Sequence, residues 1–336
     1  MAAIQDQVVV VTGASSGLGR ALALELAGRG ARLVLAARRL DELEATARRC
    51  RAQGADALVV QTDVRREADV QKLAEAAMEQ WGQIDVWINN AGVTLFALLE
   101  QDTFEAHQRV IETNLFGSMH GARAVVPIFR RQHHGVLINV GSVLSEVGQA
   151  FVPSYVISKF GVRGLSETLR VELADEPDIH VCTVMPYAID TPHFEVAPNS
   201  TGRTPFAMPP VQEPEAVARV IADLVEKPRR TRRIPRFVGA GLVAHALFPR
   251  LVEHVLLDAL RRWHLAPELP ERTSGRAGEG PRERAHIHGE RRPRLGTPRL
   301  IAWALVRVAR IEAGNLWRHV RGRTRQLPTA SAAVST

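Results

Sequence analysis

Tyr155 and Lys159 lie four residues apart, in the stretch Ser154-Tyr155-Val156-Ile157-Ser158-Lys159. The apolar spacing over residues 160–174 predicts a helix, on which side chains four apart lie one turn apart on one face. A cation beside a phenol favours the phenolate, so we expect Lys159 to lower the pKa of Tyr155 from its usual value of about 10. Tyr155 is therefore a candidate general acid or base. The alternative is a half-buried tyrosine beside a solvated lysine.

A glycine-rich loop follows the first apolar run of the chain. Residues 8–11 are four valines, which is typical of a strand buried on both faces, and they lead into Thr12-Gly13-Ala14-Ser15-Ser16-Gly17-Leu18-Gly19 and then a helical pattern. Glycines allow a tight turn and a close approach of backbone to a pyrophosphate, and the free N–H groups at a helix start favour an anion. Strand, loop and helix together predict dinucleotide binding.

The end of the second expected strand, residues 33–37, bears on which dinucleotide binds. An acidic residue there would bind the ribose 2′-hydroxyl of NAD, whereas an arginine suits the 2′-phosphate of NADP. The chain has Ala37 at that place and Arg38 after it. The sequence therefore favours NADP(H) over NAD(H), with two solvated arginines as the alternative.

Further polar residues come directly after other expected strands. Strands are expected at residues 57–60, 84–88, 136–140 and 179–184, and the carboxyl ends of parallel strands face the ligand crevice. Asn114 falls inside an expected helix of about residues 104–131, although asparagine is a poor helix former. Six such strand–helix units predict an α/β fold, a doubly wound parallel sheet of Rossmann type. The residues at or just past the strand ends are Asp63, Val64, Asn90, Ala91, Gly92, Ser142 and Pro186.

Composition limits the remaining classes. The apolar fraction of 46% and the charged fraction of 24% are ordinary for a globular protein. Two separate cysteines form neither a disulfide framework nor a metal site, and we expect no metal. The N-terminus lacks the features of a signal peptide, and no run of about 18 apolar residues occurs. A cytoplasmic protein is the expectation.

Taken together, these motifs resemble those of the short-chain dehydrogenase/reductase family. The resemblance covers roughly residues 5–240 and rests on the order of the glycine loop, Asp63, the Asn-Asn-Ala-Gly run, Asn114, Ser142 and Tyr155 with Lys159. It implies that Tyr155 exchanges a proton with the substrate oxygen, that Ser142 stabilises that oxygen, and that Asn114 holds a water that links Lys159 to solvent. It also implies a dimer or tetramer.

The resemblance further implies which residues hold the cofactor. Lys159 would bind the nicotinamide ribose, Asp63 the adenine, Asn90 the adenosine ribose and Thr191 the carboxamide. The complete set of expected cofactor-binding residues is Gly13, Ser15, Ser16, Gly17, Leu18, Gly19, Arg38, Asp63, Val64, Asn90, Ala91, Gly92, Tyr155, Lys159, Pro186 and Thr191.

One position departs from the family pattern. The family usually has Pro-Gly after the sixth strand, and this chain has Pro186-Tyr187. We expect the Tyr187 ring to face the nicotinamide or the substrate mouth and to narrow the pocket. The segments expected to line that pocket, residues 93–99, 143–152 and 194–208, are mainly apolar, so an apolar alcohol or ketone is the expected substrate.

The last third of the chain differs in charge from the rest. Of the 43 basic and 36 acidic residues, 23 basic and 8 acidic ones lie from Lys227 onward. We expect a catalytic domain over residues 1–240 with a seventh strand at 234–238, a helical extension at 241–264, a disordered linker at 265–297, a basic amphipathic helix at 298–322 and a disordered tail at 323–336.

The basic helix leaves three interpretations open. On a helical wheel, five arginines share a broad sector, with two tryptophans close to it and apolar residues on the opposite side. The helix could dock on the body or a partner subunit, lie on an anionic membrane, or have no ordered role; nucleic acid is not expected. The leading function is an NADP(H)-dependent oxidoreductase; the alternatives are a cofactor-binding regulatory or scaffolding protein and a membrane-surface reductase. The arginines of the sector are Arg299, Arg307, Arg310, Arg318 and Arg321; Trp303 and Trp317 lie close to it, and the opposite side contains Ile301, Leu305, Val308, Leu316 and Val320.

Overall fold

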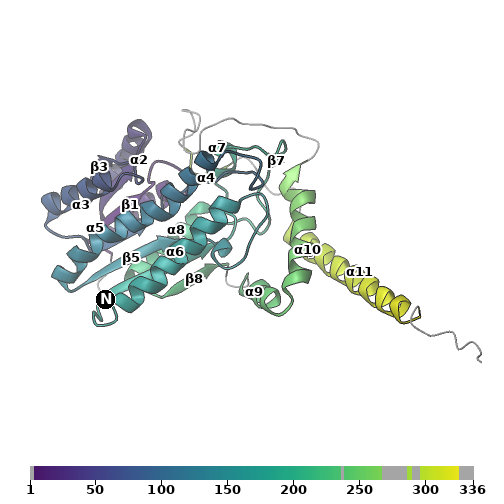
Figure 1. The fold of residues 1–336 in the computed structure, drawn as a ribbon. Helices are drawn as coiled ribbons and strands as arrows, with labels where there is room; N and C mark the ends of the chain where they lie inside the picture. Colours follow the sequence, from purple (N-terminus) through teal and green to yellow (C-terminus); the bar gives the residue numbers. More distant parts are fainter. Residues whose placement is uncertain (1–3, 236–237, 267–285, 290–295, 325–336) are drawn as a thin grey trace, which may run out of the picture.

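The computed structural model places a twisted parallel sheet between two layers of helices (Figure 1). It describes residues 4–235, 238–266, 286–289 and 296–324, with the side chains of the last helix described as far as Ile311. The strands of the main sheet are β1 (Val8–Thr12), β2 (Arg32–Ala37), β3 (Ala57–Gln61), β4 (Val86–Asn89), β5 (Gly135–Val140), β6 (Ile179–Pro186) and β8 (Thr231–Ile234).

All the neighbouring strands of this sheet pair in parallel, in the order β3-β2-β1-β4-β5-β6-β8. The order reverses direction between β1 and β4, where ligands bind in open α/β sheets. The four valines of the first strand are fully buried, because they contribute alternately to the cores on the two faces. The predicted doubly wound Rossmann-type sheet is confirmed.

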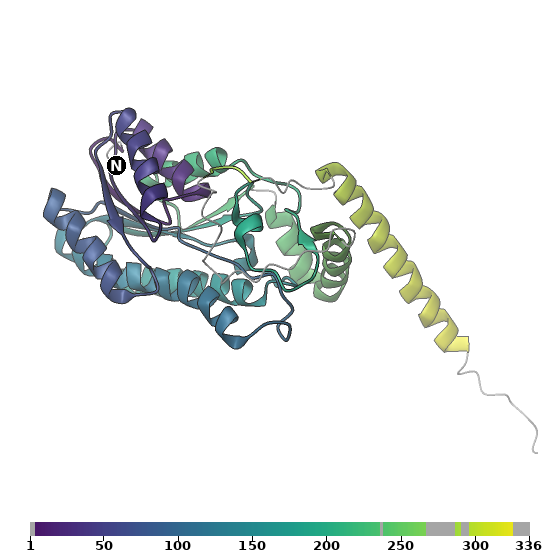
Figure 2. The same ribbon diagram turned by 90° about the horizontal axis from the view of Figure 1, so that it is seen from above.

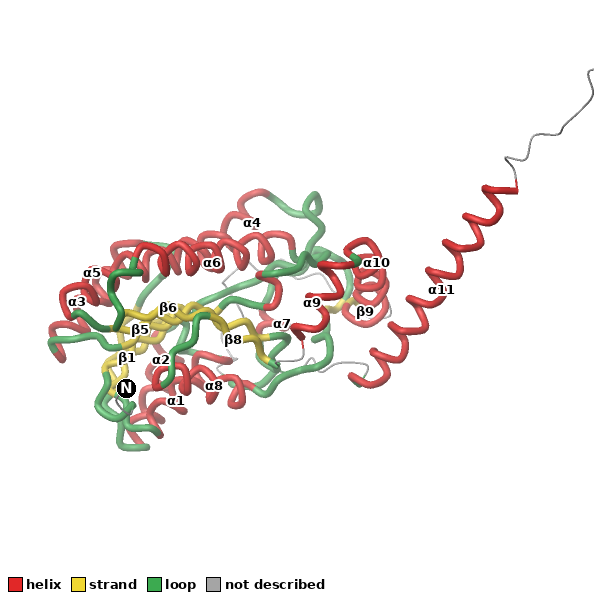
Figure 3. Tube along the Cα trace, turned by 90° about the horizontal axis from the view of Figure 1, so that it is seen from below, coloured by secondary structure: helices red, strands yellow, loops and turns green. Residues whose placement is uncertain are grey.

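Helices cover both faces of the sheet, as the view from below shows (Figure 3). One core packs α1 (Gly17–Gly28), α2 (Leu40–Ala52) and α8 (Pro214–Glu226) against the sheet. The other packs α3 (Glu67–Trp81), α5 (Gly117–Gln132) and α6 (Pro153–Glu172) against the opposite face. Each core includes residues from most strands of the sheet, so helices pack on both faces of the strands that lead to the site.

Three expected elements have different bounds in the structure. The helix expected over residues 104–131 is divided into α4 (Phe104–Ile111), a π-helical turn η1 (Glu112–Phe116) and α5. The seventh strand lies at Thr231–Ile234 rather than 234–238, because Thr183 to Pro186 of β6 pair with it there. The helical extension breaks at Pro249 into α9 (Val238–Leu247), α10 (Pro249–Ala259) and a π-helical turn η3 (Leu260–His264).

The extension closes back onto the catalytic body. Strand β9 (Leu265–Ala266) pairs antiparallel with β7 (Thr204–Pro205), which follows the short helix α7 (His193–Val196). Helix α11 (Thr297–Thr324) packs its first turns on α10 and then projects away from the body (Figures 1 and 2). The side chains expected on the wheel beyond Ile311, Trp317 and Arg318 among them, lie outside the described residues, as do residues 267–285, 290–295 and 325–336 of the expected linker and tail.

Trp303 and Arg307, from the basic sector of α11, face the body. The Trp303 ring stands edge-on to that of Trp263 with 4.5 Å between centroids, and Arg307 Nε donates to Asp258 Oδ2 at 2.6 Å. Ile301, Leu305 and Val306 are exposed. These contacts favour the docking interpretation for the first half of the helix. In the described part of the chain, no helix combines the length and the apolar character needed to cross a bilayer.

Candidate active site

A cavity of about 360 Å³ opens at the carboxyl ends of the strands and collects the candidate residues. All sixteen expected cofactor-binding residues line it, and so does Ser142. Asn114 lies behind the wall of the cavity. Tyr155, His193, Phe194 and His264 line it as well, so one continuous space joins the glycine loop to an aromatic region.

The glycine loop has the backbone that its sequence predicts. Gly13 has a φ of +71° and Gly17 a φ of +52°, in the left-handed region that favours glycine. A Cβ on Gly19 would lie 2.1 Å from the Gly13 carbonyl oxygen, so only glycine fits there. Asn90 braces the loop by donating from Nδ2 to the Thr12 carbonyl at 2.9 Å. The loop therefore places the N-terminus of α1 at the cavity, where its N–H groups suit a pyrophosphate.

Tyr155 and Lys159 both lie on α6 and line the cavity, as expected. The Lys159 ammonium lies 5.5 Å from the centre of the Tyr155 ring. The expected lowering of the Tyr155 pKa is wrong for this arrangement. Burial raises the pKa of Tyr155 to about 12, against a smaller opposing effect of a hydrogen bond with Ser142. The phenol is therefore protonated at neutral pH.

The burial of Lys159 explains why its charge has little effect on the pKa of Tyr155. Lys159 is 4% exposed, and its Nζ donates to the Val140 carbonyl at 2.8 Å. Burial lowers the pKa of Lys159 to about 8, since the charged form loses its hydration. The same burial, with repulsion from Lys159, lowers the pKa of His193 to about 4. The site thus holds a neutral imidazole beside a phenol and a weakly basic amine.

The structure explains why Asn114, a poor helix former, occurs within a helical segment. It lies in the π-helical turn η1, a feature that often marks functional sites. Its Oδ1 accepts from the Val93 N–H at 2.8 Å, and its Nδ2 donates to the Val93 carbonyl and to Ser158 Oγ, both at 2.9 Å. Its oxygen also lies near Lys159, since a Cβ on Gly92 would meet both side chains. Asn114 therefore ties the loop after β4, at Val93, to α6.

The adenosine end of the cavity carries Arg38 and Asp63. Arg38 is exposed at the rim. The pKa of Asp63 is lowered, because hydrogen bonds and the charge of Arg65 outweigh its partial burial. Arg39, which sequence reasoning did not single out, also lines the cavity and donates to Ser16 Oγ at 3.2 Å. A second guanidinium therefore stands beside the glycine loop.

Tyr187 occupies the position where the family usually has glycine, and it adopts a backbone conformation that a non-glycine residue can take. It lies outside the left-handed region, and its N–H donates to the Ile234 carbonyl at 2.8 Å. The ring lines the cavity and also packs with Met208, Leu260 and Trp263. Tyr187 therefore connects the pocket wall to the extension, in addition to its expected place at the cavity. Thr191 lies above the glycine loop, since a Cβ on Gly17 would be 3.3 Å from its Cβ.

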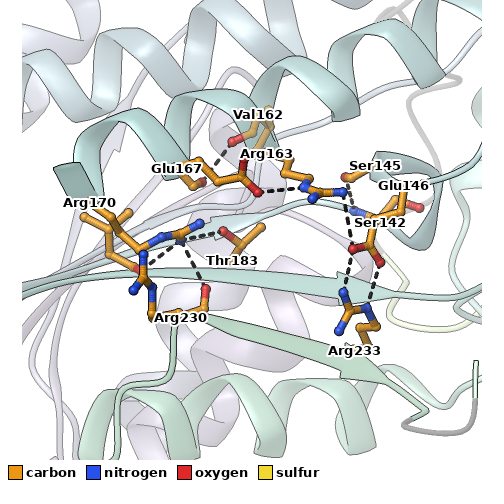
Figure 4. A network of polar contacts seen from close by, with 12 residues as sticks. Ser142, Ser145, Glu146, Val162, Arg163, Glu167, Arg170, Thr183, Arg230 and Arg233 are labelled. Carbon is orange, nitrogen blue, oxygen red and sulfur yellow. Dashed lines mark hydrogen bonds and ion pairs between the residues drawn. The ribbon is translucent and has the colours of Figure 1, made fainter. Parts of the chain in front are cut away.

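A charged network holds the loop that carries Ser142 (Figure 4). The loop forms the short helix η2 (Val143–Ser145), and Ser142 Oγ accepts from the Leu144 N–H at 3.1 Å. Next to it, Glu146 accepts from Arg233 Nε at 2.7 Å and from Arg163 at 3.3 Å. The side chain of Glu146 is only 9% exposed. The loop is therefore tied to β8 and to α6 at once.

Two further groups at the site, His264 and residues 286–289, come from the part of the chain that follows the sequence motifs. His264, in η3, lines the cavity and contacts the Phe96 ring in a tilted arrangement, with 5.6 Å between ring centroids. Residues 286–289 cross the glycine loop, where the Gly17 N–H donates to the His286 carbonyl at 2.9 Å. His288 there joins Asp190 and Glu213 in a group whose potential ligand atoms lie within 4.8 Å of one another. The sequence held no motif for either, because both depend on how the tail folds back.

Comparison with known proteins gives the family of this fold and site. The model of the short chain dehydrogenase family matches residues 7–200. The oxidoreductase YxnA of Bacillus subtilis strain 168 is 37% identical over 256 residues, which are 75% of this chain and 72% of that protein. The chain belongs to the short-chain dehydrogenase/reductase family and is an oxidoreductase of that family.

Two solved structures are similar in fold and carry nicotinamide dinucleotides. An alcohol dehydrogenase from the archaeon Thermococcus sibiricus, in complex with 5-hydroxy-NADP, has a TM-score of 0.60 at 28% identity and covers 68% of this chain and 95% of its own. A family member from Burkholderia phymatum in complex with NAD has a TM-score of 0.67 at 27% identity and covers 75% of this chain and 96% of its own. Both of these neighbours therefore bind a nicotinamide dinucleotide or a derivative of one.

Proposed function

We propose that the protein is an NADP(H)-dependent oxidoreductase that transfers hydride between the nicotinamide and the alcohol or carbonyl carbon of an apolar small molecule. The observation that carries the proposal is the single cavity that brings Tyr155, Ser142 and Lys159 together with the glycine loop and Arg38. The residues present suit a dinucleotide, because a helix N-terminus, a close-packed glycine cradle and two arginines meet at one end.

Tyr155 is the proposed general acid. Its pKa of about 12 keeps it protonated at neutral pH, so it can donate to the oxygen of a carbonyl as that oxygen becomes an alkoxide. Ser142 donates a hydrogen bond to the same oxygen and stabilises its developing charge. When bound, the nicotinamide supplies or takes the hydride. The buried phenol therefore suits carbonyl reduction at neutral pH better than alcohol oxidation.

Lys159 and Asn114 are the proposed supporting residues. Lys159 would bind the nicotinamide ribose, and Asn114 would link Lys159 to solvent through water. Asp63 and Asn90 would hold the adenosine, and Thr191, above the glycine loop, the carboxamide. Ser15, Ser16 and Leu18 would contact the pyrophosphate with the three glycines.

The preference for NADP(H) rests on Arg38 and is tested by titration. We expect NADPH to bind at least about tenfold more tightly than NADH, since a charge-assisted phosphate contact is worth about 1.5–3 kcal/mol. Arg38→Ala should lower that ratio about tenfold by weakening NADPH alone. Arg48→Ala, which removes an exposed arginine of α2 away from the cavity, is the matched control. Nicotinamide fluorescence measures both dissociation constants; an unchanged ratio in Arg38→Ala would contradict the assignment.

The alternative functions and the role of α11 give separate predictions. A regulatory or scaffolding role would give dinucleotide binding without turnover of any alcohol or ketone. The packing of Trp303 on Trp263 of η3 and the bond from Arg307 to Asp258 of α10 support docking of α11 on this chain, and contact with an anionic membrane remains a prediction from the sequence. Assembly into a homo-oligomer and a cytoplasmic location likewise stay predictions.

A further inference from the structure

His193 is an imidazole at the reacting end of the cavity that the proposed chemistry does not use. It is the first residue of α7, two residues after Thr191, and it lines the cavity. Its ring stands edge-on to the Tyr155 ring with 6.0 Å between centroids, and edge-on to the Phe194 ring at the same distance. Both of these neighbours line the cavity as well. The imidazole therefore lies beside the proposed general acid and next to the aromatic wall.

The ring nitrogens of His193 are open to the cavity. The ring makes no hydrogen bond within the described part of the chain, and neither of its nitrogens is among the enclosed side-chain atoms there that lack a partner. Both nitrogens therefore keep accessible surface, in agreement with the half-buried state of the residue. Since the rings packed against it belong to the cavity wall, this surface faces the space where a substrate would bind.

The imidazole is neutral at pH 7. Burial, with a smaller contribution from repulsion by Lys159, lowers the pKa of His193 to about 4. A neutral imidazole has one N–H donor and one acceptor nitrogen, and no bond to a described residue fixes which nitrogen carries the hydrogen. A hydroxyl group suits both tautomers, because it can accept from the N–H or donate to the other nitrogen.

Other polar side chains of the cavity are placed differently. Thr94 Oγ1 and His264 Nε2 also lack a partner among the described residues, but both atoms are enclosed, so a substrate would not reach them without a rearrangement. Tyr187 belongs to the apolar cluster of the extension, whereas Tyr155 packs in a different cluster. His193 combines accessible nitrogens with a direct contact to the Tyr155 ring.

We propose that the His193 imidazole forms a hydrogen bond with a hydroxyl group on the carbon next to the one that exchanges hydride. The substrate class is therefore a 2-hydroxy ketone, or the corresponding vicinal diol, on an otherwise apolar molecule. This inference rests on the proposed function, in which the reacting oxygen lies at Tyr155 and Ser142. A substituent on the neighbouring carbon is then the part of the substrate closest to an imidazole packed on the Tyr155 ring. A carboxylate fits less well, because the imidazole is neutral and the adjoining Phe96 and Phe194 are apolar.

Three cyclohexanones test the proposal with the full-length protein and saturating NADPH. The set is cyclohexanone, 2-hydroxycyclohexanone and 4-hydroxycyclohexanone, of which only the second has its hydroxyl beside the reacting carbon. We expect kcat/KM of wild type for the 2-hydroxy ketone to exceed that for the other two roughly tenfold, because a site that hydrogen-bonds a substrate hydroxyl rejects the analogue without it. Equal values, or a preference for the 4-hydroxy ketone, would overturn the proposal.

Two variants assign the preference to His193. His193→Phe keeps an aromatic ring against Tyr155 and Phe194 but has no nitrogen, and it should lower the ratio of kcat/KM for the 2-hydroxy ketone to that for cyclohexanone about tenfold, chiefly through KM. Electron withdrawal by the neighbouring oxygen is a property of the ketone and survives in this variant, so the loss reports the hydrogen bond. His193→Gln keeps a donor and an acceptor and should retain part of the ratio.

Control variants remove other polar groups of the cavity wall. Tyr187→Phe and Gln149→Leu should keep the ratio of the two kcat/KM values. Loss of the ratio in either of them, with retention in His193→Phe, would assign the hydroxyl to that residue instead of His193. The dissociation constant of NADPH should stay within about twofold of wild type in His193→Phe; a larger loss would place His193 at the cofactor and contradict the proposal.

A binding readout separates this proposal from the proposed function. In the complex with NADP⁺, 1,2-cyclohexanediol should raise the Tm of wild type more than 1,4-cyclohexanediol does at the same concentration, and it should lose that advantage in His193→Phe. Equal stabilisation of wild type by the two diols would count against the hydrogen bond to His193. A stabilisation that depends on His193, without turnover of any of the three ketones, would keep the hydrogen bond and contradict the proposed reaction.

Discussion

Burial governs the protonation of the two residues with the clearest chemical role. The sequence places Tyr155 and Lys159 on one helical face, and they do lie there, but it contains no measure of how deeply each is enclosed. Desolvation acts in opposite directions on a phenol and an amine: it raises the pKa of Tyr155 and lowers that of Lys159. The pair is therefore biased toward its neutral forms.

The buried amine has a consequence for stability against pH. The pKa of Lys159 falls from an ordinary 10.5 to about 8 on folding. Below pH 8 the folded protein must hold a desolvated charge; between pH 8 and 10.5 the unfolded chain binds a proton that the folded one has released. This group therefore makes the free energy of unfolding rise with pH across that window.

Lys159→Met should be more stable than wild type at pH 7, by about 2–3 kcal/mol, because the variant buries no charge. The advantage should shrink by pH 9.5, where wild-type Lys159 is mostly neutral, while turnover is lost throughout. Urea unfolding of both proteins at the two pH values measures this difference. A constant difference would show that burial of the charge does not set the pKa of Lys159.

At the scale of elements, the loop after β5 depends on a carboxylate that takes no part in the proposed chemistry. Glu146 binds Arg233 of β8 and Arg163 of α6, directly beyond the helix that Ser142 caps (Figure 4). Hydrogen bonds between charged groups are worth about 1.5–3 kcal/mol when little exposed. The network therefore fixes where the Ser142 hydroxyl stands relative to Tyr155.

Glu146→Gln should lower kcat roughly tenfold with little change in the KM for NADPH, because a displaced Ser142 stabilises the reacting oxygen less well. Glu167→Gln is the matched control, since Glu167 also binds Arg163, at 2.8 Å, but is 53% exposed and lies on α6 rather than next to the loop in sequence. Steady-state kinetics separate kcat from KM. A similar loss in the control, or a loss confined to KM, would argue against positioning of Ser142 by Glu146.

Element order and strand ends were predictable, because strongly periodic apolar runs and glycine turns are local signals. The strand and helix bounds that differ from the prediction depend mainly on contacts with residues far away in the sequence. The seventh strand is set by pairing with β6, and the break at Pro249 follows from proline, which cannot continue a helix from the preceding turn. Asn114 signalled an irregularity, but its π-helical turn is fixed by hydrogen bonds to Val93, 21 residues away. His264 had no local signal, since only the β7–β9 pairing brings it to the cavity.

At the scale of the whole molecule, α11 supports the wall that contains His264. Trp303 packs on Trp263, the residue before His264, and both belong to one apolar cluster with Tyr187 and Met208. Among the described residues, the contacts between the projecting helix and this wall include the Trp303–Trp263 pair, the packing of Leu300 and the Arg307–Asp258 pair.

Trp303→Ala should raise the KM for the ketone severalfold and leave NADPH binding unchanged, because the loss of the aromatic contact loosens η3 but not the glycine loop. Ile301→Ala, an exposed position on the same helix, should change neither quantity. Ketone kinetics and NADPH titration on the two variants measure the contrast. Equal effects of the two substitutions would show that α11 does not support the wall.

The pairing of β7 with β9 also bears on how selectivity could be exchanged between relatives. Residues 204–206 and 264–266 pair with each other from two distant stretches of the chain, and His264 lines the cavity, whereas the residues proposed to act on the substrate oxygen lie between Ser142 and Lys159. A graft that moved residues 204–206 without the extension would remove the hydrogen bond between the Phe206 carbonyl and the His264 imidazole. We therefore expect an exchange between relatives to keep this pairing only when residues 204–206 and 264–266 move together, as they would after recombination at a point between Lys159 and Thr204.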